Sequence, residues 1–299
     1  MATRKKFQGT GTALVTPFTR DGKLDEQTVR RLVEFQIKGG VEAIIPAGTT
    51  GESPTLEEDE HRRLIEIVVD QNRKRVKIIA GAGTNSTAHS IRLSKQAKEA
   101  GADILLLVGP YYNKPSQEGY YQHFRTIAEA VDLPFIVYNV PTRTSGNIEP
   151  STLLRIAKDI PTAAGVKEAS GSMPQIMEIA RNKPEGFSLL SGDDVFTLPL
   201  MAVGGDGVIS VISNEVPKIF SEMVRYCLKN NYKKAVAIHN KLLPLMQANF
   251  FEANPMPVKA ALAMMGMIEE VYRLPLVKIG DANRQKLLAV LRELKLLKG

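Results

Sequence analysis

The chain has 299 residues, of which 43% are hydrophobic and 24% charged, and these proportions are ordinary for a folded protein with a large core. The formal net charge is +7, but the basic residues are scattered over expected helix faces and no nucleic-acid-binding motif is present, so no nucleic-acid partner is expected. The only cysteine, Cys227, excludes an internal disulfide and fits a reducing compartment. No apolar run follows the basic N-terminus, and no segment approaches the roughly 20 apolar residues of a membrane span. We therefore expect a cytoplasmic protein without a membrane partner.

Short apolar runs rich in Val, Ile and Leu alternate with amphipathic segments through most of the chain. The runs cover residues 12–16, 42–47, 76–80, 103–108, 134–138, 163–166, 187–190 and 207–211. The segments between and after them predict helices at 25–38, 56–72, 86–100, 118–130, 151–158, 173–182, 195–203 and 216–230. The runs are almost continuously apolar, as in parallel strands that are buried on both faces. Eight such units predict an α/β fold, a (β/α)8 TIM barrel. An open doubly wound sheet is disfavoured because no Gly-x-Gly-x-x-Gly turn follows an early strand.

The strand signal stops near residue 231. Three helical patterns remain, at 232–250, 257–268 and 283–297. We therefore expect a catalytic barrel over residues 1–230 and a C-terminal helical domain of three helices over residues 231–299. This appendage is either a second small domain or an oligomer contact.

A lysine and a tyrosine end two of the expected strands, where the chemistry of such barrels takes place. Lys167 follows the run at 163–166 with no turn between them, so its amine should point into the barrel mouth. Burial there would lower the pKa of the amine and provide a nucleophile; the alternative is an ion pair with a carboxylate such as Glu168. Tyr138 ends the run at 134–138 and is either a core aromatic or an acid–base group beside the amine.

Further polar residues follow other strands. The loop at 48–53 reads Gly-Thr-Thr-Gly-Glu-Ser, which is either a turn with a helix cap or a site for a carboxylate or phosphate. It lacks the Gly-Lys-Ser/Thr ending of a nucleotide-binding loop. Arg143 is either a carboxylate ligand or a surface charge. No metal site is expected, because the four histidines show no ligand spacing: His61, His89, His123 and His239.

Four motifs in the same order resemble the dihydrodipicolinate synthase family, which also contains N-acetylneuraminate lyase. They are Gly-Thr-Thr-Gly-Glu-Ser at 48–53, Pro-Tyr-Tyr-Asn-Lys-Pro-Ser-Gln-Glu-Gly at 110–119, Tyr-Asn-Val-Pro-Thr-Arg-Thr at 138–144 and Gly-Val-Lys-Glu-Ala-Ser at 165–170. The resemblance covers nearly the whole chain and extends to Asn-Pro-Met-Pro-Val-Lys at 254–259. It implies a TIM-barrel lyase, with no metal or organic cofactor, that serves diaminopimelate and lysine biosynthesis.

The resemblance also implies a mechanism. Lys167 would form an imine with pyruvate, and the derived enamine would add to L-aspartate 4-semialdehyde. Tyr138, Thr49 and Tyr112 would form the proton relay, with Tyr112 reaching the active site of a neighbouring subunit. The family is typically a homotetramer, a dimer of dimers, so assembly would be part of catalysis.

The resemblance assigns the substrate contacts as well. Thr50 would hold the pyruvate carboxylate, Arg143 would hold the semialdehyde carboxylate, and Gly192 and Ile209 would line the pocket through backbone atoms. Arg143 and the paired threonines favour the synthase pattern over the sialate lyase branch, which usually shows Gly-Ser-Thr-Gly-Glu. The alternatives are a related pyruvate-dependent aldolase that acts on a sugar acid or another aldehyde, like N-acetylneuraminate lyase or 2-keto-3-deoxygluconate aldolase, and a non-catalytic binding member of the family.

One set of positions departs from the pattern of feedback-inhibited relatives, which bind lysine at the dimer interface. The corresponding residues here are Ser53, Pro54, Glu58, His61, Asn85, His89 and Tyr111. Inhibited bacterial forms often carry a histidine in place of Glu58 and a glutamate in place of His89. Because a histidine has no fixed negative charge for the effector's ammonium, the resemblance predicts weak or absent inhibition by lysine.

Overall fold

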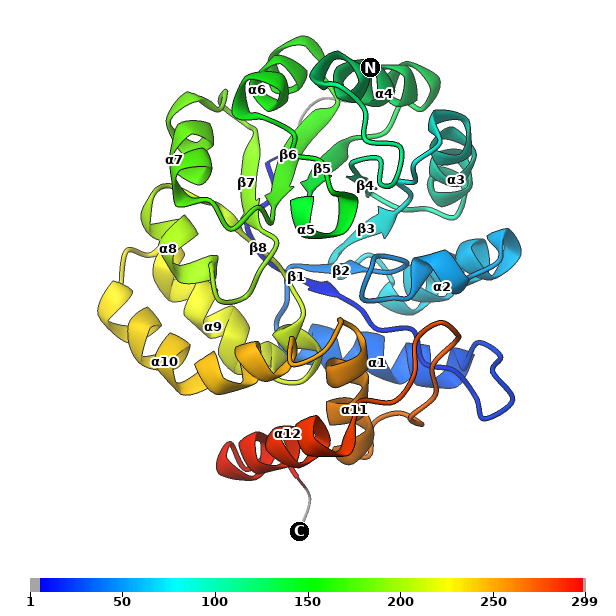
Figure 1. Ribbon diagram of the computed structural model, residues 1–299, viewed down its shortest axis with the longest axis vertical. Coiled ribbons are helices and arrows are strands. Elements are labelled where there is room, and N and C mark those ends of the chain that lie inside the picture. Colours follow the sequence, from blue (N-terminus) through cyan, green and yellow to red (C-terminus); the bar gives the residue numbers. More distant parts are fainter. Residues whose placement is uncertain (1–5, 298–299) are drawn as a thin grey trace.

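A closed barrel of eight parallel strands forms the centre of the protein (Figure 1). The structure is a computed structural model that describes residues 6–297; Arg4 and Lys5 of the basic start of the chain fall outside this range. Neighbouring strands follow one another in chain order around the barrel, and β8 pairs with β1. The helices surround the strands, so the predicted (β/α)8 TIM barrel is confirmed.

The strands match the apolar runs with one exception. They are β1 (Gly9–Ala13), β2 (Ala43–Ile45), β3 (Lys77–Gly81), β4 (Ile104–Val108), β5 (Phe135–Asn139), β6 (Ala163–Glu168), β7 (Ser188–Ser191) and β8 (Gly207–Ser210). The prediction of the first strand at 12–16 was wrong, because β1 begins three residues earlier. Its sequence Gly-Thr-Gly-Thr-Ala carries little apolar signal. The glycines of β1 are needed for close approach: a Cβ on Gly9 would lie 2.6 Å from the Glu42 Oε2, and a Cβ on Gly11 would lie 2.7 Å from the Ile45 Cδ1.

The eight predicted helices of the barrel are present, and each begins and ends within two residues of its predicted bounds. They are α1 (Glu26–Lys38), α2 (Glu58–Asn72), α3 (Thr87–Glu99), α4 (Gln117–Ala130), α6 (Pro150–Asp159), α7 (Met173–Asn182), α8 (Thr197–Ala202) and α9 (Pro217–Leu228). Side chains cap several of them; Asp25, for example, accepts a hydrogen bond from the Thr28 backbone N–H at 3.0 Å. The single turn of helix α5 (Pro141–Thr144), directly after β5, was not predicted.

Two apolar clusters form the core. The larger one fills the space between the strands and the surrounding helices. The smaller one fills the barrel itself, and it includes Ile45, Ile79, Ile136 and Leu190 from different strands. The barrel is therefore a packed core and not a pore, which leaves its C-terminal end as the place for a site.

Three helices follow the barrel, as predicted: α10 (Tyr232–Ala248), α11 (Met256–Met264) and α12 (Asp281–Glu293). Figure 1 shows α10 beside α9, and α11 and α12 together beyond α1. The segment between α10 and α11 reaches the C-terminal end of the barrel, where Asn254 contacts Thr50. The division of the chain between residues 230 and 231 stays a prediction.

A buried ion pair joins α11 to the loop at 48–53. The Lys259 ammonium contacts the Glu52 carboxylate, and both side chains are fully buried. Glu52 also accepts a hydrogen bond from the Arg273 backbone N–H at 3.3 Å, and the Phe18 ring centroid lies 4.5 Å from the Lys259 ammonium. The ammonium is thus enclosed by one carboxylate and an aromatic face, so each charge of the pair depends on the other.

Replacement of Lys259 by methionine should lower the free energy of unfolding by about 3–5 kcal/mol, because Glu52 would be left buried without its cation. Equilibrium unfolding in urea measures this loss. The double variant E52M/K259M should recover most of the stability, since it removes both charges together. A loss below about 1 kcal/mol in the single variant would show that the ion pair contributes little to holding α11 against the loop at 48–53.

Candidate active site

A cavity of about 300 Å³ opens at the C-terminal end of the barrel. It is lined by Thr49, Thr50, Tyr138, Val140, Thr142, Arg143, Lys167, Ala169, Gly192, Asp193, Val211, Phe250, Ala253 and Asn254. Six of the eight residues predicted for the site are among them. Only Tyr112 and Ile209 are not. A concave site with a few convergent polar groups at this end of the barrel is the expected form of an active site.

Lys167 points into this cavity from β6. Its side chain is 6% exposed, and its ammonium lies 4.0 Å from the ring centroid of Tyr138, the residue paired with it on β5. Glu168 points the opposite way, because successive side chains of a strand alternate. Its carboxylate accepts hydrogen bonds from the backbone N–H of Ser170 at 2.7 Å and from Gln175 at 3.1 Å. The alternative of a Lys167–Glu168 ion pair was therefore wrong for the part of the chain that the structure describes.

Burial changes the titration of the Lys167 amine. Loss of hydration lowers the pKa of Lys167 to about 7, while the nearby Asp194 carboxylate acts to raise it and the Arg143 guanidinium lowers it further. Asp194 is held by the backbone N–H groups of Val211 and Ile212, at 3.0 and 2.8 Å. A large share of the Lys167 amine is thus neutral near pH 7, as a nucleophile requires.

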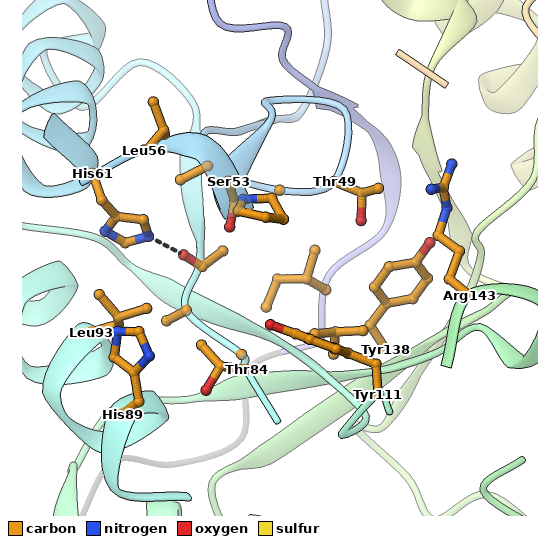
Figure 2. A pocket seen from close by; sticks show the side chains of 18 of the residues that line it. Thr49, Ser53, Leu56, His61, Thr84, His89, Leu93, Tyr111, Tyr138 and Arg143 are labelled. Atoms are coloured by element: carbon orange, nitrogen blue, oxygen red, sulfur yellow. Dashed lines mark hydrogen bonds between the residues drawn. The ribbon is translucent and has the colours of Figure 1, made fainter. Parts of the chain in front are cut away.

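The Tyr138 phenol lies between two polar groups. Burial raises the pKa of Tyr138 to about 12, against the influence of Arg143 and of a hydrogen bond with the Thr49 side chain, both of which act to lower it. Figure 2 shows the phenol directed toward Thr49 and Arg143. These contacts provide a path by which a proton could reach or leave the space beside the amine.

Two polar side chains at the entrance are held by the segment between α10 and α11. The Arg143 guanidinium on α5 donates to the Asn254 carbonyl oxygen at 3.2 Å. The Asn254 side-chain amide donates to the Thr50 hydroxyl oxygen at 3.0 Å, and Thr50 is 2% exposed. Sequence reasoning missed Asn254, Phe250 and Ala253 as parts of the site. The motif at 254–259 was the only signal of them, because strand ends alone do not reveal a distant segment that folds back.

Gly192 leaves space beside the reactive amine. A Cβ at this position would lie 2.7 Å from the Ala169 Cβ and 3.2 Å from the Lys167 Cε. A side chain here would therefore displace Lys167 or fill the cavity. Ile209 lies elsewhere: it packs in the barrel interior and is 1% exposed, whereas Val211, two residues further, lines the cavity.

Tyr112 stands apart from the other predicted residues. It is 91% exposed, and its backbone has the left-handed φ of 71°. It does not line the cavity within its own chain. A role for Tyr112 thus requires another subunit.

A second cavity of about 520 Å³ adjoins the first and shares Thr49, Tyr138, Val140 and Arg143 with it (Figure 2). Six of the seven positions that the sequence analysis matched to the lysine-binding site of inhibited relatives line it: Ser53, Pro54, Glu58, His61, His89 and Tyr111. The Glu58 carboxylate lies 3.2 Å from the His89 imidazole and 3.4 Å from a guanidinium of α3.

Neither a metal cluster nor a membrane-spanning helix is found between residues 6 and 297. No group of three or more His, Cys, Asp or Glu side chains is placed to hold a metal ion. No helix in this range is both long and apolar enough to cross a bilayer.

The reactivity of Lys167 should report its lowered pKa. In competitive labelling with acetic anhydride, acetylation of Lys167 should rise with pH to a plateau above about pH 7, because the neutral amine reacts and burial disfavours the ammonium. Peptide mass spectrometry measures the modified fraction, with the exposed Lys233 as the internal reference. An apparent pKa near the ordinary lysine value of about 10.4 would contradict the proposed desolvation.

Comparisons with known proteins show the family of the chain. Residues 6–294 match the sequence model of the Dihydrodipicolinate synthetase family. The chain is 55% identical to 4-hydroxy-tetrahydrodipicolinate synthase of Koribacter versatilis over 98% of both chains. Among solved structures, dihydrodipicolinate synthase of Thermotoga maritima superposes with a TM-score of 0.96 at 46% identity and covers 97% of this chain and 99% of its own. A monomeric dihydrodipicolinate synthase variant has the same TM-score and identity over 97% of this chain and 98% of its own. The chain therefore belongs to the dihydrodipicolinate synthetase family.

Proposed function

We propose that this protein is a 4-hydroxy-tetrahydrodipicolinate synthase, which condenses pyruvate with L-aspartate 4-semialdehyde in diaminopimelate and lysine biosynthesis. The observation that carries the proposal is the buried Lys167 amine, whose pKa is lowered to about 7, in one cavity with Tyr138 and Arg143. The names of the similar curated proteins support the same activity and do not favour a sugar-acid aldolase. We also propose a cytoplasmic location, and a division of the chain into a catalytic barrel over residues 1–230 and a helical domain over residues 231–299.

The chemistry follows from an amine that can become an electron sink. The neutral Lys167 amine attacks the keto carbon of pyruvate, and loss of water gives a protonated imine. The imine withdraws electrons so that a methyl proton can leave, and the resulting enamine forms a carbon–carbon bond with the aldehyde. The amino group of the added substrate then displaces Lys167 as the ring closes. Tyr138, Thr49 and Tyr112 carry the protons, and no metal or organic cofactor is required.

We propose the substrate contacts from the charge of each side chain and from its position in the cavity. Thr50 holds the pyruvate carboxylate, and the Arg143 guanidinium holds the carboxylate of the semialdehyde at the entrance. Gly192 leaves room for the imine beside Lys167. Ile209 contributes through backbone atoms at the end of β8.

We further propose a homotetramer built as a dimer of dimers. The 91% exposure of Tyr112 supports it, since this phenol serves the relay only if it enters the site of a neighbouring subunit. A monomeric variant exists among similar solved structures, so membership of the family alone does not decide the assembly.

The activity is tested by a coupled assay together with chemical trapping. Pyruvate, aspartate semialdehyde and dihydrodipicolinate reductase should give oxidation of a reduced nicotinamide, whereas sialate and 2-keto-3-deoxygluconate should give no turnover. Borohydride with pyruvate should leave a covalent adduct on Lys167, and K167A should lose both the adduct and the turnover because no other lysine between residues 6 and 297 lines the cavity. Turnover of a sugar acid in place of the semialdehyde would support the aldolase alternative. Folded protein without any adduct would support a binding role.

Inhibition by lysine should be weak or absent, with half-inhibition at or above one millimolar. An incoming ammonium would have to compete for the Glu58 carboxylate with His89 and Arg92, which already lie within 3.2–3.4 Å of it. The charge-swapped variant E58H/H89E places the carboxylate on α3 and should be more sensitive to lysine than the unmodified protein. Half-inhibition below one millimolar in the unmodified protein would contradict this proposal.

A further inference from the structure

We propose that Asn254 is a positioning residue that aims the Thr50 hydroxyl at the pyruvate carboxylate, an inference that rests on the proposed function. Asn254 comes from the segment between α10 and α11 and is 6% exposed. It contacts both residues assigned to substrate carboxylates: its side chain donates to Thr50, and its backbone carbonyl accepts from Arg143.

The contact with Thr50 sets the direction of one proton. A threonine hydroxyl has one donor hydrogen and two acceptor lone pairs. The Asn254 Nδ2 donates a hydrogen bond to the Thr50 Oγ1 at 3.0 Å, and this bond uses one of the two lone pairs. Within residues 6–297, the Thr50 hydroxyl donates no hydrogen bond of its own. Its hydrogen is thus left for an acceptor in the cavity, and a carboxylate is the strongest acceptor that a substrate can offer.

The contact with Arg143 works through the backbone. The Arg143 Nη2 lies 3.2 Å from the Asn254 carbonyl oxygen. Substitution of the Asn254 side chain leaves this carbonyl in place. The two substrate contacts can therefore be separated, since a side-chain variant should disturb the carboxylate of pyruvate and spare that of the aldehyde.

The segment is held firmly enough to act in this way. Lys259, at the start of α11, donates its backbone N–H to the Pro255 carbonyl at 3.0 Å, and its ammonium forms the buried pair with Glu52. Glu52 lies two residues after Thr50. Both sides of the Asn254–Thr50 hydrogen bond are thus attached to one buried ion pair, which fixes the distance between them.

The orientation of the amide distinguishes this role from simple packing. Asn254 Oδ1 is buried and has no hydrogen-bond partner in the described part of the chain. If Asn254 served only to fill space, its removal in N254A would have the same effect with and without the Thr50 hydroxyl. An aspartate at this position would accept the Thr50 hydrogen and withdraw it from the substrate.

The test uses N254D, N254A and the control N283A in the full chain. Asn283 donates to Glu252 at 2.9 Å and ties α12 to the same segment, without contact to the cavity. For each variant we would measure kcat, KM for pyruvate, KM for the aldehyde, and borohydride trapping against pyruvate concentration. Thermal unfolding checks the fold. The variants T50A and T50A/N254A complete a double-mutant cycle.

We expect N254D and N254A to raise KM for pyruvate by roughly tenfold or more, with kcat and KM for the aldehyde changed by less than about threefold. N283A should leave all three parameters unchanged. In the T50A background, N254A should add less than about a twofold effect, because the proton it directs is gone. An unchanged KM for pyruvate in N254D, or the full effect of N254A in the T50A background, overturns the positioning role. Absence of an adduct in the unmodified protein overturns the proposed function itself.

Discussion

The alternation of side chains along β5 and β6 is the constraint on which the site depends. Tyr138 pairs with Lys167 and Asn139 pairs with Glu168, so one pair enters the barrel and the next faces the helices. The carboxylate that is adjacent to the lysine in sequence is thereby kept on the other face of the sheet. Within residues 6–297 no carboxylate forms an ion pair with the buried amine, and its pKa falls. A shift of one residue in this register would exchange amine for carboxylate inside the barrel.

The sequence predicted the parts of the fold that depend on buried strands and their ends. Runs such as Ile104–Val108 are apolar because both faces of the strand are covered, and Lys167 and Tyr138 were found because they end such runs. β1 escaped this reasoning since Gly9 and Gly11 have no space for a Cβ beside Glu42 and Ile45, and a start made of glycine and threonine offers no apolar signal. The contact between Asn254 and Thr50 joins residues 204 positions apart, and neither periodicity nor capping carries information over such a separation.

The C-terminal helices are part of the site through two different kinds of contact. The Glu52–Lys259 pair is fully buried and attaches α11 to the threonine loop, since either charge alone would be costly to bury. Asn254 then places its amide on Thr50 and its carbonyl on Arg143. The ion pair attaches α11 to the barrel, and the Asn254 contacts orient the Thr50 and Arg143 side chains. A barrel that ended at residue 230 would keep Lys167 and Tyr138 but would lose the groups that orient Thr50 and Arg143.

Arg143 links the chemistry of the two central groups. Its positive charge acts to lower the pKa of both Lys167 and Tyr138, so it favours the neutral amine and the ionised phenol. The neutral amine is the form that attacks a ketone, and the ionised phenol is the form that removes a proton. In the proposed mechanism Lys167 is already joined to pyruvate when the second substrate binds. A substrate carboxylate bound to Arg143 would then offset part of this charge and shift the Tyr138 phenol back toward its protonated form. The arginine would therefore support formation of the imine while the entrance is empty, and would favour return of protons once the second substrate occupies it.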